Sequence, residues 1–204
     1  MTTLTPDRLQ RRKQAIRVAA HAARNAQADR DVVSQRITDV VMSLPEYQHA
    51  KRVMWYIDVR GEVRTQHAFP VALASDKAVV IPYCVEGELG LFHLESMDEL
   101  APGRYGILEP KQELRDITGK HIGVEQVDLI LVPGVAFDSR GGRIGHGQGY
   151  YDKLLAKTRP DTSLVALAFQ CQIVAEIPVL PHDISMDKVV TQTHVYTGQG
   201  RTPS

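Results

Sequence analysis

Apolar runs alternate with amphipathic segments along most of this chain. Five runs predict strands, and they cover residues 52–57, 78–81, 127–132, 164–169 and 188–191. The first two show little polar alternation, which is typical of strands buried on both faces. The run 127–132 is the clearest central strand. Residues 89–94 instead alternate between apolar and polar, which predicts an antiparallel or edge strand.

Helical periodicity predicts four helices between these runs. The first has a clear start signal, because Thr5 can cap it, Pro6 suits its first position and Asp7 puts an acid in the first turn. Pro45 is expected to end the second helix. The four predicted helices cover residues 6–27, 31–44, 65–74 and 150–158.

The alternation of strands and helices predicts an α/β protein. We expect a single three-layer α/β/α domain with a mostly parallel central sheet. No linker or internal repeat divides the chain, so the domain is expected to span 1–197, followed by a frayed C-terminal tail at 198–204. The segment 101–124 is predicted to be a long loop, rich in glycine, proline and charge.

Composition narrows the classes of function. The chain has 204 residues and a formal net charge of +0, so no global basic field is available for nucleic acid. No apolar run approaches the ~20 residues that span a bilayer. The two cysteines, Cys84 and Cys171, exclude a disulfide framework and a zinc ribbon. We expect both to be buried in or beside strands, in a cytoplasmic protein that is a monomer.

Positive charge is concentrated at the beginning of the chain. Residues 1–30 hold seven Lys or Arg residues against two Asp, a net charge of +5 that the remainder balances. An Arg- and Ala-rich start also resembles an organelle transit peptide, but Asp7 and the helix-start signal favour a structured helix. Four basic side chains share one face of this helix, which is either a solvated face or an anion-binding stripe. They are Lys13, Arg17, His21 and Arg24.

A glycine-rich segment follows the central strand. It holds Gly134, Gly141, Gly142, Gly145, Gly147 and Gly149. Glycines let the backbone approach a ligand closely, and successive N–H groups beside a helix start can hold phosphate oxygens. Arg143 adds a guanidinium for the same anion. The pattern is neither a Walker A sequence nor a Rossmann fingerprint. A flexible surface loop is the alternative interpretation.

The residues that open the next helix add two kinds of chemistry. Tyr150 and Tyr151 point in different directions, so one ring can pack in the core while the other lines a pocket for a planar ring. Asp152 can hold Mg²⁺ through one carboxylate oxygen, with phosphates and water as the other ligands. On spacing alone, complementing the helix dipole is the simpler role for Asp152.

Over roughly residues 8–196, the sequence resembles the 5-formyltetrahydrofolate cyclo-ligase family, also called 5,10-methenyltetrahydrofolate synthetase. The glycine motif Arg143–Asp152 carries most of the resemblance. The supporting motifs are Lys13-x-x-x-Arg17, Leu44-Pro-Glu-Tyr-x-x-Ala-Lys51, Glu62-Val-x-Thr65, Tyr105-Gly-Ile-x-Glu109-Pro110, Asp128-Leu-Ile-x-Val-Pro-Gly134 and Phe137-Asp138.

The resemblance implies the reaction and most of the site. The family converts 5-formyltetrahydrofolate to 5,10-methenyltetrahydrofolate, with ATP as co-substrate, Mg²⁺ as metal, and ADP and phosphate as products. Lys13 and Arg17 match the N-terminal ATP-binding pair, and Asp152 and Asp187 match positions that hold magnesium. The second ATP-binding segment comprises Arg143, Ile144, Gly145, His146, Gly147, Gln148, Gly149, Tyr150 and Tyr151.

Ile57 and Glu62 match the folate-binding positions of the family, and three tyrosines are candidates for stacking on the substrate: Tyr105, Tyr150 and Tyr151. His146 and Gln148 stand where the motif varies. The residues assigned catalytic roles are Lys13, Arg143 and Tyr151.

The hypothesised mechanism begins when the formyl oxygen attacks the γ-phosphorus of ATP. The folate N10 then closes the ring, and phosphate leaves. The protein mainly positions groups and neutralises charge in such a reaction. Two rivals are a non-catalytic folate or nucleotide sensor on the same fold, and a different kinase or phosphohydrolase. Neither a nucleic acid nor a membrane is expected as a partner.

Overall fold

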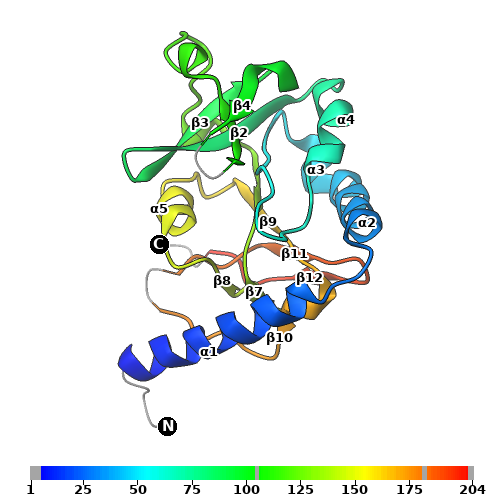
Figure 1. The fold of residues 1–204 in the computed structure, drawn as a ribbon, viewed down its shortest axis with the longest axis vertical. Helices are drawn as coiled ribbons and strands as arrows, with labels where there is room; N and C mark the ends of the chain where they lie inside the picture. Colours follow the sequence, from blue (N-terminus) through cyan, green and yellow to red (C-terminus); the bar gives the residue numbers. More distant parts are fainter. Residues whose placement is uncertain (1–5, 104–105, 181–182, 202–204) are drawn as a thin grey trace.

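A large, mostly parallel sheet forms the centre of the computed structural model, which describes residues 6–103, 106–180 and 183–201. Its seven strands follow the order β12-β11-β9-β6-β1-β2-β3 (Figure 1). The bounds are β1 (Arg52–Met54), β2 (Ala78–Val85), β3 (Glu88–Leu94), β6 (Leu129–Val132), β9 (Ser163–Leu167), β11 (Lys188–Val190) and β12 (Val195–Thr197). Strands β2, β1, β6, β9 and β11 pair in parallel, and β3 and β12 add antiparallel edges. The predicted fold class and the central position of β6 are therefore confirmed.

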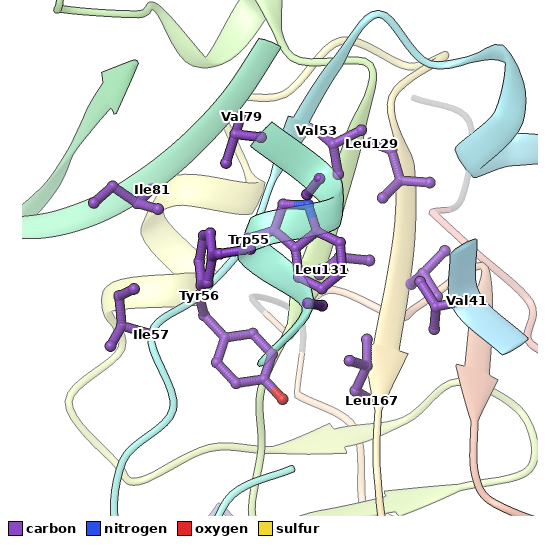
Figure 2. Close-up of a cluster of buried hydrophobic side chains, with 14 of the residues drawn as sticks. Val41, Val53, Trp55, Tyr56, Ile57, Val79, Ile81, Leu129, Leu131 and Leu167 are labelled. Carbon is purple, nitrogen blue, oxygen red and sulfur yellow. The ribbon is translucent and has the colours of Figure 1, made fainter. Parts of the chain in front are cut away.

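Both faces of this sheet are buried, as the lack of polar alternation predicts. Val53 belongs to one core cluster and its neighbour Met54 to another, because successive side chains of a strand point to opposite faces. The first cluster packs under the helices α2 (Arg30–Ser43), α3 (Pro45–His49) and α4 (Phe69–Leu73). Figure 2 shows Trp55 and Leu131 within it. The second cluster includes Leu154 and Leu155 of α5 (Tyr150–Leu155).

The longest helix, α1 (Pro6–Asn25), packs elsewhere. Ala20 of α1 belongs to a separate cluster with Ala136 and Ile144 of a small three-stranded sheet. That sheet has the order β10-β7-β8, and its strands are β7 (Ala136–Asp138), β8 (Arg143–Ile144) and β10 (Ile173–Val174). On the face of the central sheet that the second cluster covers, the next layer therefore consists of α5 and the small sheet. The small sheet carries α1 on its outer side (Figure 1).

Short elements account for most differences from the sequence-based expectations. Pro45 ends α2 as predicted, but it also begins α3, since proline suits the first turn of a helix. The expected loop 101–124 contributes to a two-stranded sheet of β4 (Leu100–Pro102) and β5 (Leu108–Pro110). Strand β12 follows the strand that was expected to be last. The described residues also form the short 3₁₀ helices η1 (Gln66–Ala68), η2 (Met97–Glu99), η4 (Gln112–Leu114), η5 (Val124–Gln126) and η6 (Gln170–Gln172).

Two further expectations are corrected by the structure. Cys84 and Cys171 are exposed rather than buried, since Cys84 lies near the end of the long β2–β3 hairpin and Cys171 lies in η6. The expected fraying from residue 198 does not apply to the last described residues. Arg201 donates hydrogen bonds to the carbonyl oxygen of Pro160 at 2.9 Å and the hydroxyl of Thr158 at 2.7 Å.

One carboxylate ties the amino end of β1 to the amino end of β6. Asp128 accepts the backbone N–H groups of Lys51 and Arg52, both at 2.9 Å, and the guanidinium of Arg159 at 3.1 Å. Burial raises the pKa of Asp128, but the hydrogen bonds from Arg52, Arg159 and Lys51 outweigh burial, so the pKa lies below its ordinary value.

Asp128→Ala is expected to lower the free energy of unfolding by about 1–2 kcal/mol at neutral pH, because it strips these donors of their acceptor. A carboxyl group whose pKa is lowered by folding stabilises above its ordinary pKa and loses this contribution as the pH falls through the folded value. The difference from the parent protein should therefore shrink towards pH 3 in denaturant unfolding. The control is Asp76→Ala, whose carboxylate is exposed. An equal loss of unfolding free energy at neutral pH and at pH 3 would contradict this stabilising role of the Asp128 carboxylate.

Candidate active site

The glycine segment Arg143–Gly149 leads from the small sheet into α5. Gly147 has φ 96° and Gly149, which precedes the helix, has φ 70°, conformations that favour glycine. The segment is held from one side by α1, because Arg17 donates its Nε–H to the carbonyl oxygen of Gly145 at 3.0 Å. It is therefore an anchored loop with its backbone near a helix start, rather than a segment without tertiary contacts.

The basic face of α1 is not a solvated face throughout. Lys13 is 6% exposed and Arg24 is 0% exposed. The ammonium of Lys13 forms an ion pair with Asp183. Arg24 donates to the carbonyl oxygens of Gly134 at 3.3 Å and Arg60 at 2.8 Å, so it ties α1 to the segments that follow β6 and β1.

Burial lowers the pKa of Arg24, and the negative charge of Glu62 acts against this effect. The Nε–H of Arg24 is buried and has no hydrogen-bond partner among the described residues. This side chain therefore brings positive charge into the interior close to the glycine segment. Sequence reasoning placed it on the basic stripe but did not select it as a site residue.

Arg143 lies at the beginning of the segment and is 7% exposed. Its Nη2 donates to Oδ1 of Asp152 at 2.6 Å, and its Nη1 donates to the carbonyl oxygen of Pro133 at 3.5 Å. Its buried Nε–H has no hydrogen-bond partner among residues 6–103, 106–180 and 183–201. Asp152 therefore fixes the orientation of the Arg143 guanidinium, which keeps one buried N–H without a partner among the described residues.

The two tyrosines that begin α5 are both half-buried, and Tyr151 is the one that contacts Arg143. The ring of Tyr151 lies under the guanidinium of Arg143, with 5.7 Å between the guanidinium carbon and the ring centroid, and it packs against the second core cluster. Burial raises the pKa of Tyr151 strongly, the charge of Glu62 adds to this effect, and Arg143 opposes it. The phenol of Tyr151 is therefore protonated at neutral pH. Tyr150 is half-buried, and Tyr105 lies outside the described residues.

Glu62 approaches the glycine segment from the other side. It is 5% exposed and follows β1, the strand adjacent to β6. Its Oε2 accepts the N–H of Val59 at 3.0 Å, and its Oε1 contacts Nε2 of His146 at 3.1 Å. The ring of His146 also lies 5.5 Å from that of His21 on α1, measured between centroids. Burial lowers the pKa of His21, and the neighbouring Arg24 and His146 lower it further.

The remaining predicted residues have varied surroundings. Ile57 and Ile144 are buried in core clusters, whereas Gln148 is exposed. Asp187 comes directly before β11, where its Oδ2 accepts the N–H of Leu164 at 2.7 Å. Neither a hydrogen bond nor an ion pair joins Asp187 to Asp152 in the part of the chain that the structure describes, which also contains no group of three or more His, Cys, Asp or Glu side chains that could hold a metal ion.

Comparison with known proteins identifies the family. The family model described as the 5-formyltetrahydrofolate cyclo-ligase family matches residues 9–192. The chain belongs to this family. Its relatives include the probable 5-formyltetrahydrofolate cyclo-ligase of Schizosaccharomyces pombe, which is 32% identical over 200 residues, covering 90% of this chain and 97% of the relative. The 5-formyltetrahydrofolate cyclo-ligase of Escherichia coli K12 is 31% identical, covering 80% of this chain and 90% of that protein.

A solved structure agrees with this family assignment. The 5,10-methenyltetrahydrofolate synthetase of Aquifex aeolicus, determined by NMR, matches with a TM-score of 0.79 and 33% sequence identity. The match covers 94% of this chain and 96% of that chain. The resemblance that the glycine motif indicates is thus confirmed for the family of enzymes and for the fold. Every residue of the glycine segment lies within the residues that the family model matches.

Proposed function

We propose that the chain converts 5-formyltetrahydrofolate to 5,10-methenyltetrahydrofolate, with hydrolysis of ATP to ADP and phosphate and with Mg²⁺ as the metal. One observation carries this proposal beyond the family match. The glycine segment contacts α1 through Arg17 and Gly145, and it contacts the buried carboxylate of Glu62 through His146. A loop of a phosphate-binding type therefore lies next to a carboxylate that suits a second substrate. Transfer of a group between two bound molecules requires such proximity.

The triphosphate is assigned to the cationic side of this arrangement. Lys13, Arg17 and Arg143 supply positive charge, and the unpartnered Nε–H of Arg143 supports a direct contact. Backbone N–H groups of the glycine segment complete the proposed site. The full ATP-binding set is Lys13, Arg17, Arg143, Ile144, Gly145, His146, Gly147, Gln148, Gly149, Tyr150 and Tyr151.

The folate is assigned to the side of Glu62. A buried carboxylate is a suitable acceptor for the N–H edge of a pterin, and Val59 already fixes one of its oxygens. Tyr150 and Tyr151 are assigned to the aromatic rings of the substrate, and Ile57 adds apolar surface. Tyr105 remains a candidate on sequence grounds.

The proposed chemistry begins with attack of the formyl oxygen on the γ-phosphorus, which forms a phosphorylated iminium species and releases ADP. The N10 amine then adds to the formyl carbon and gives up its proton to solvent, and departure of phosphate leaves the methenyl ring. Lys13 and Arg143 are assigned to the charge that develops on the transferring phosphoryl group, and protonated Tyr151 packs against Arg143 and helps to orient it.

A magnesium ion with Asp152 as one of few protein ligands fits this site better than an ion coordinated by protein groups alone. One oxygen of Asp152 holds Arg143, while Oδ2 accepts no hydrogen bond from the described residues. Magnesium commonly takes one or two carboxylates and completes its shell with phosphates and water. When bound, it would neutralise charge on the phosphate oxygens. Asp187 stays the proposed second ligand, although its carboxylate already accepts a backbone N–H.

Asp152→Asn is expected to raise the Mg²⁺ concentration for half-maximal activity several-fold, because an amide oxygen binds the ion less well than a carboxylate. Magnesium titration of initial rates measures this, with Asp161→Asn as a control at an exposed carboxylate. Asp187→Asn tests the second proposed ligand separately. An unaltered magnesium dependence would remove the substituted residue from the metal site.

The function is tested by growth of absorbance at the band of the methenyl product, with dependence on both ATP and 5-formyltetrahydrofolate. Tight folate binding without turnover would favour a non-catalytic sensor. ADP release that is equally fast without folate would favour a different kinase or phosphohydrolase. The family match and the retention of Lys13, Arg17, Arg143 and Asp152 together support the enzyme over both alternatives.

Cellular context is part of the same proposal. Among the described residues, none of the helices is long and apolar enough to cross a membrane. We propose a cytoplasmic monomer that acts on small molecules, with neither a nucleic acid nor a membrane as partner. The Arg-rich beginning of the chain forms α1, which packs on the small sheet and contributes Arg17 to the site.

A further inference from the structure

Each oxygen of the Glu62 carboxylate already has a hydrogen-bond partner within the protein. Val59 donates its N–H to Oε2, and His146 occupies Oε1 at 3.1 Å. If Glu62 binds the N–H edge of the pterin, the substrate needs an oxygen that His146 now occupies. The two donors therefore compete for one buried acceptor, because a carboxylate that is 5% exposed has few other directions from which it can be approached.

His146 is placed so that it can leave Glu62 without disturbing the core. It lies between Gly145 and Gly147, and Gly147 has φ 96°, so the backbone on both sides carries no side chain. The imidazole is 29% exposed, in contrast to the buried Glu62. The ring of His21 also lies beside it, with the two ring planes tilted by 39°, and this contact is not a hydrogen bond.

The surroundings of His146 favour exchange of one anion for another. Arg17 and Arg24 on α1 and Arg60 in the segment before Glu62 make this region cationic. Glu62 is the anion that His146 contacts here. A triphosphate bound to the glycine segment would bring a second, stronger acceptor to the same imidazole, since charge-assisted hydrogen bonds to phosphate are favourable.

We propose that His146 is a positioning residue that couples the two substrate sites. In the nucleotide-free protein, it blocks Glu62 by donating to Oε1. Nucleotide binding moves the imidazole to the phosphates and frees Glu62 for the pterin. The inference rests on the proposed function, because it requires ATP on the glycine segment and folate on Glu62. It makes nucleotide a positive effector of folate binding, and by linkage folate increases nucleotide affinity by the same factor.

The test is calorimetric titration of 5-formyltetrahydrofolate into the full chain, with and without a non-hydrolysable ATP analogue and Mg²⁺. The analogue is expected to tighten folate binding to the parent protein about tenfold, the value of one charge-assisted hydrogen bond. His146→Ala is expected to bind folate about tenfold more tightly without nucleotide and to lose the effect of the analogue. His146→Gln keeps an N–H donor and should retain weak binding and most of the coupling.

A matched control is His49→Ala, at an exposed histidine that ends α3, and it should behave as the parent protein does. His146→Asn, whose amide is too short to replace Nε2, provides the same test if the alanine variant does not fold. Weaker or unchanged folate binding in His146→Ala would overturn the inference, as would coupling that persists without the imidazole. If the parent protein turns over no 5-formyltetrahydrofolate, the proposed function itself fails instead.

Discussion

Arg143→Ala is expected to reduce kcat/KM for ATP by roughly 10³-fold, because it removes the buried guanidinium proposed to stabilise the transferring phosphoryl group. Binding of 5-formyltetrahydrofolate should be retained, since Arg143 contacts Asp152, Pro133 and Tyr151 rather than Glu62. Steady-state kinetics with each substrate varied in turn, together with folate titration, measure the two effects separately.

Two further variants show whether the loss is specific to this guanidinium. Arg143→Lys keeps the charge but not the planar fork, so it should recover only part of the rate. Arg140→Ala removes an exposed arginine three residues away that pairs with Glu176, and it should leave the kinetics unchanged. Asp152 loses its ion-pair partner in Arg143→Ala, so a thermal melt of this variant checks that α5 stays folded. An unchanged KM and kcat for ATP would contradict the assignment of Arg143.

Glu62→Gln is expected to raise KM for 5-formyltetrahydrofolate by roughly 10²-fold, because the pterin loses a charged acceptor in a buried position. Glutamine has the same shape and keeps an oxygen for the N–H of Val59, so the local fold should persist. Binding of the ATP analogue should change little. Calorimetry with each ligand separately provides the measurement.

The control for this variant is Glu86→Gln, at an exposed position in the β2–β3 turn. An equal loss of folate and nucleotide binding in Glu62→Gln would point to a folding defect. Unchanged folate affinity would remove Glu62 from the substrate site, and it would then leave its contact with His146 as a purely structural one.

The sequence predicts the long and buried elements well. α1, α2 and the parallel strands have strong periodicity or continuous apolar runs, and these signals report burial directly. The short elements give no such signal. β7 and β8 together contain five residues inside a glycine-rich stretch, and their pairing depends on contacts with each other rather than on a local pattern. α3 has only five residues, so its periodicity is undetectable.

Prediction of the candidate site follows the same division. The contiguous glycine motif and the helical spacing of Lys13 and Arg17 can be recognised in one dimension. The contact between His146 and Glu62 joins positions 84 residues apart, and no sequence pattern indicates it. Helical spacing did place Arg24 on the basic face, but its complete burial depends on two distant carbonyl groups, those of Gly134 and Arg60.

The way in which α1 is attached has a consequence for affinity. This helix carries Lys13 and Arg17, yet its core contacts belong to the small cluster around Ala20 and Ala136 rather than to the two large clusters of the central sheet. A segment with few buried apolar contacts can detach locally while the rest of the protein stays folded. If Lys13 and Arg17 bind ATP as proposed, the observed nucleotide affinity equals the intrinsic affinity multiplied by the docked fraction of α1. Substitutions in the small cluster around Ala20 and Ala136 would then change ATP affinity without altering a residue that contacts a phosphate.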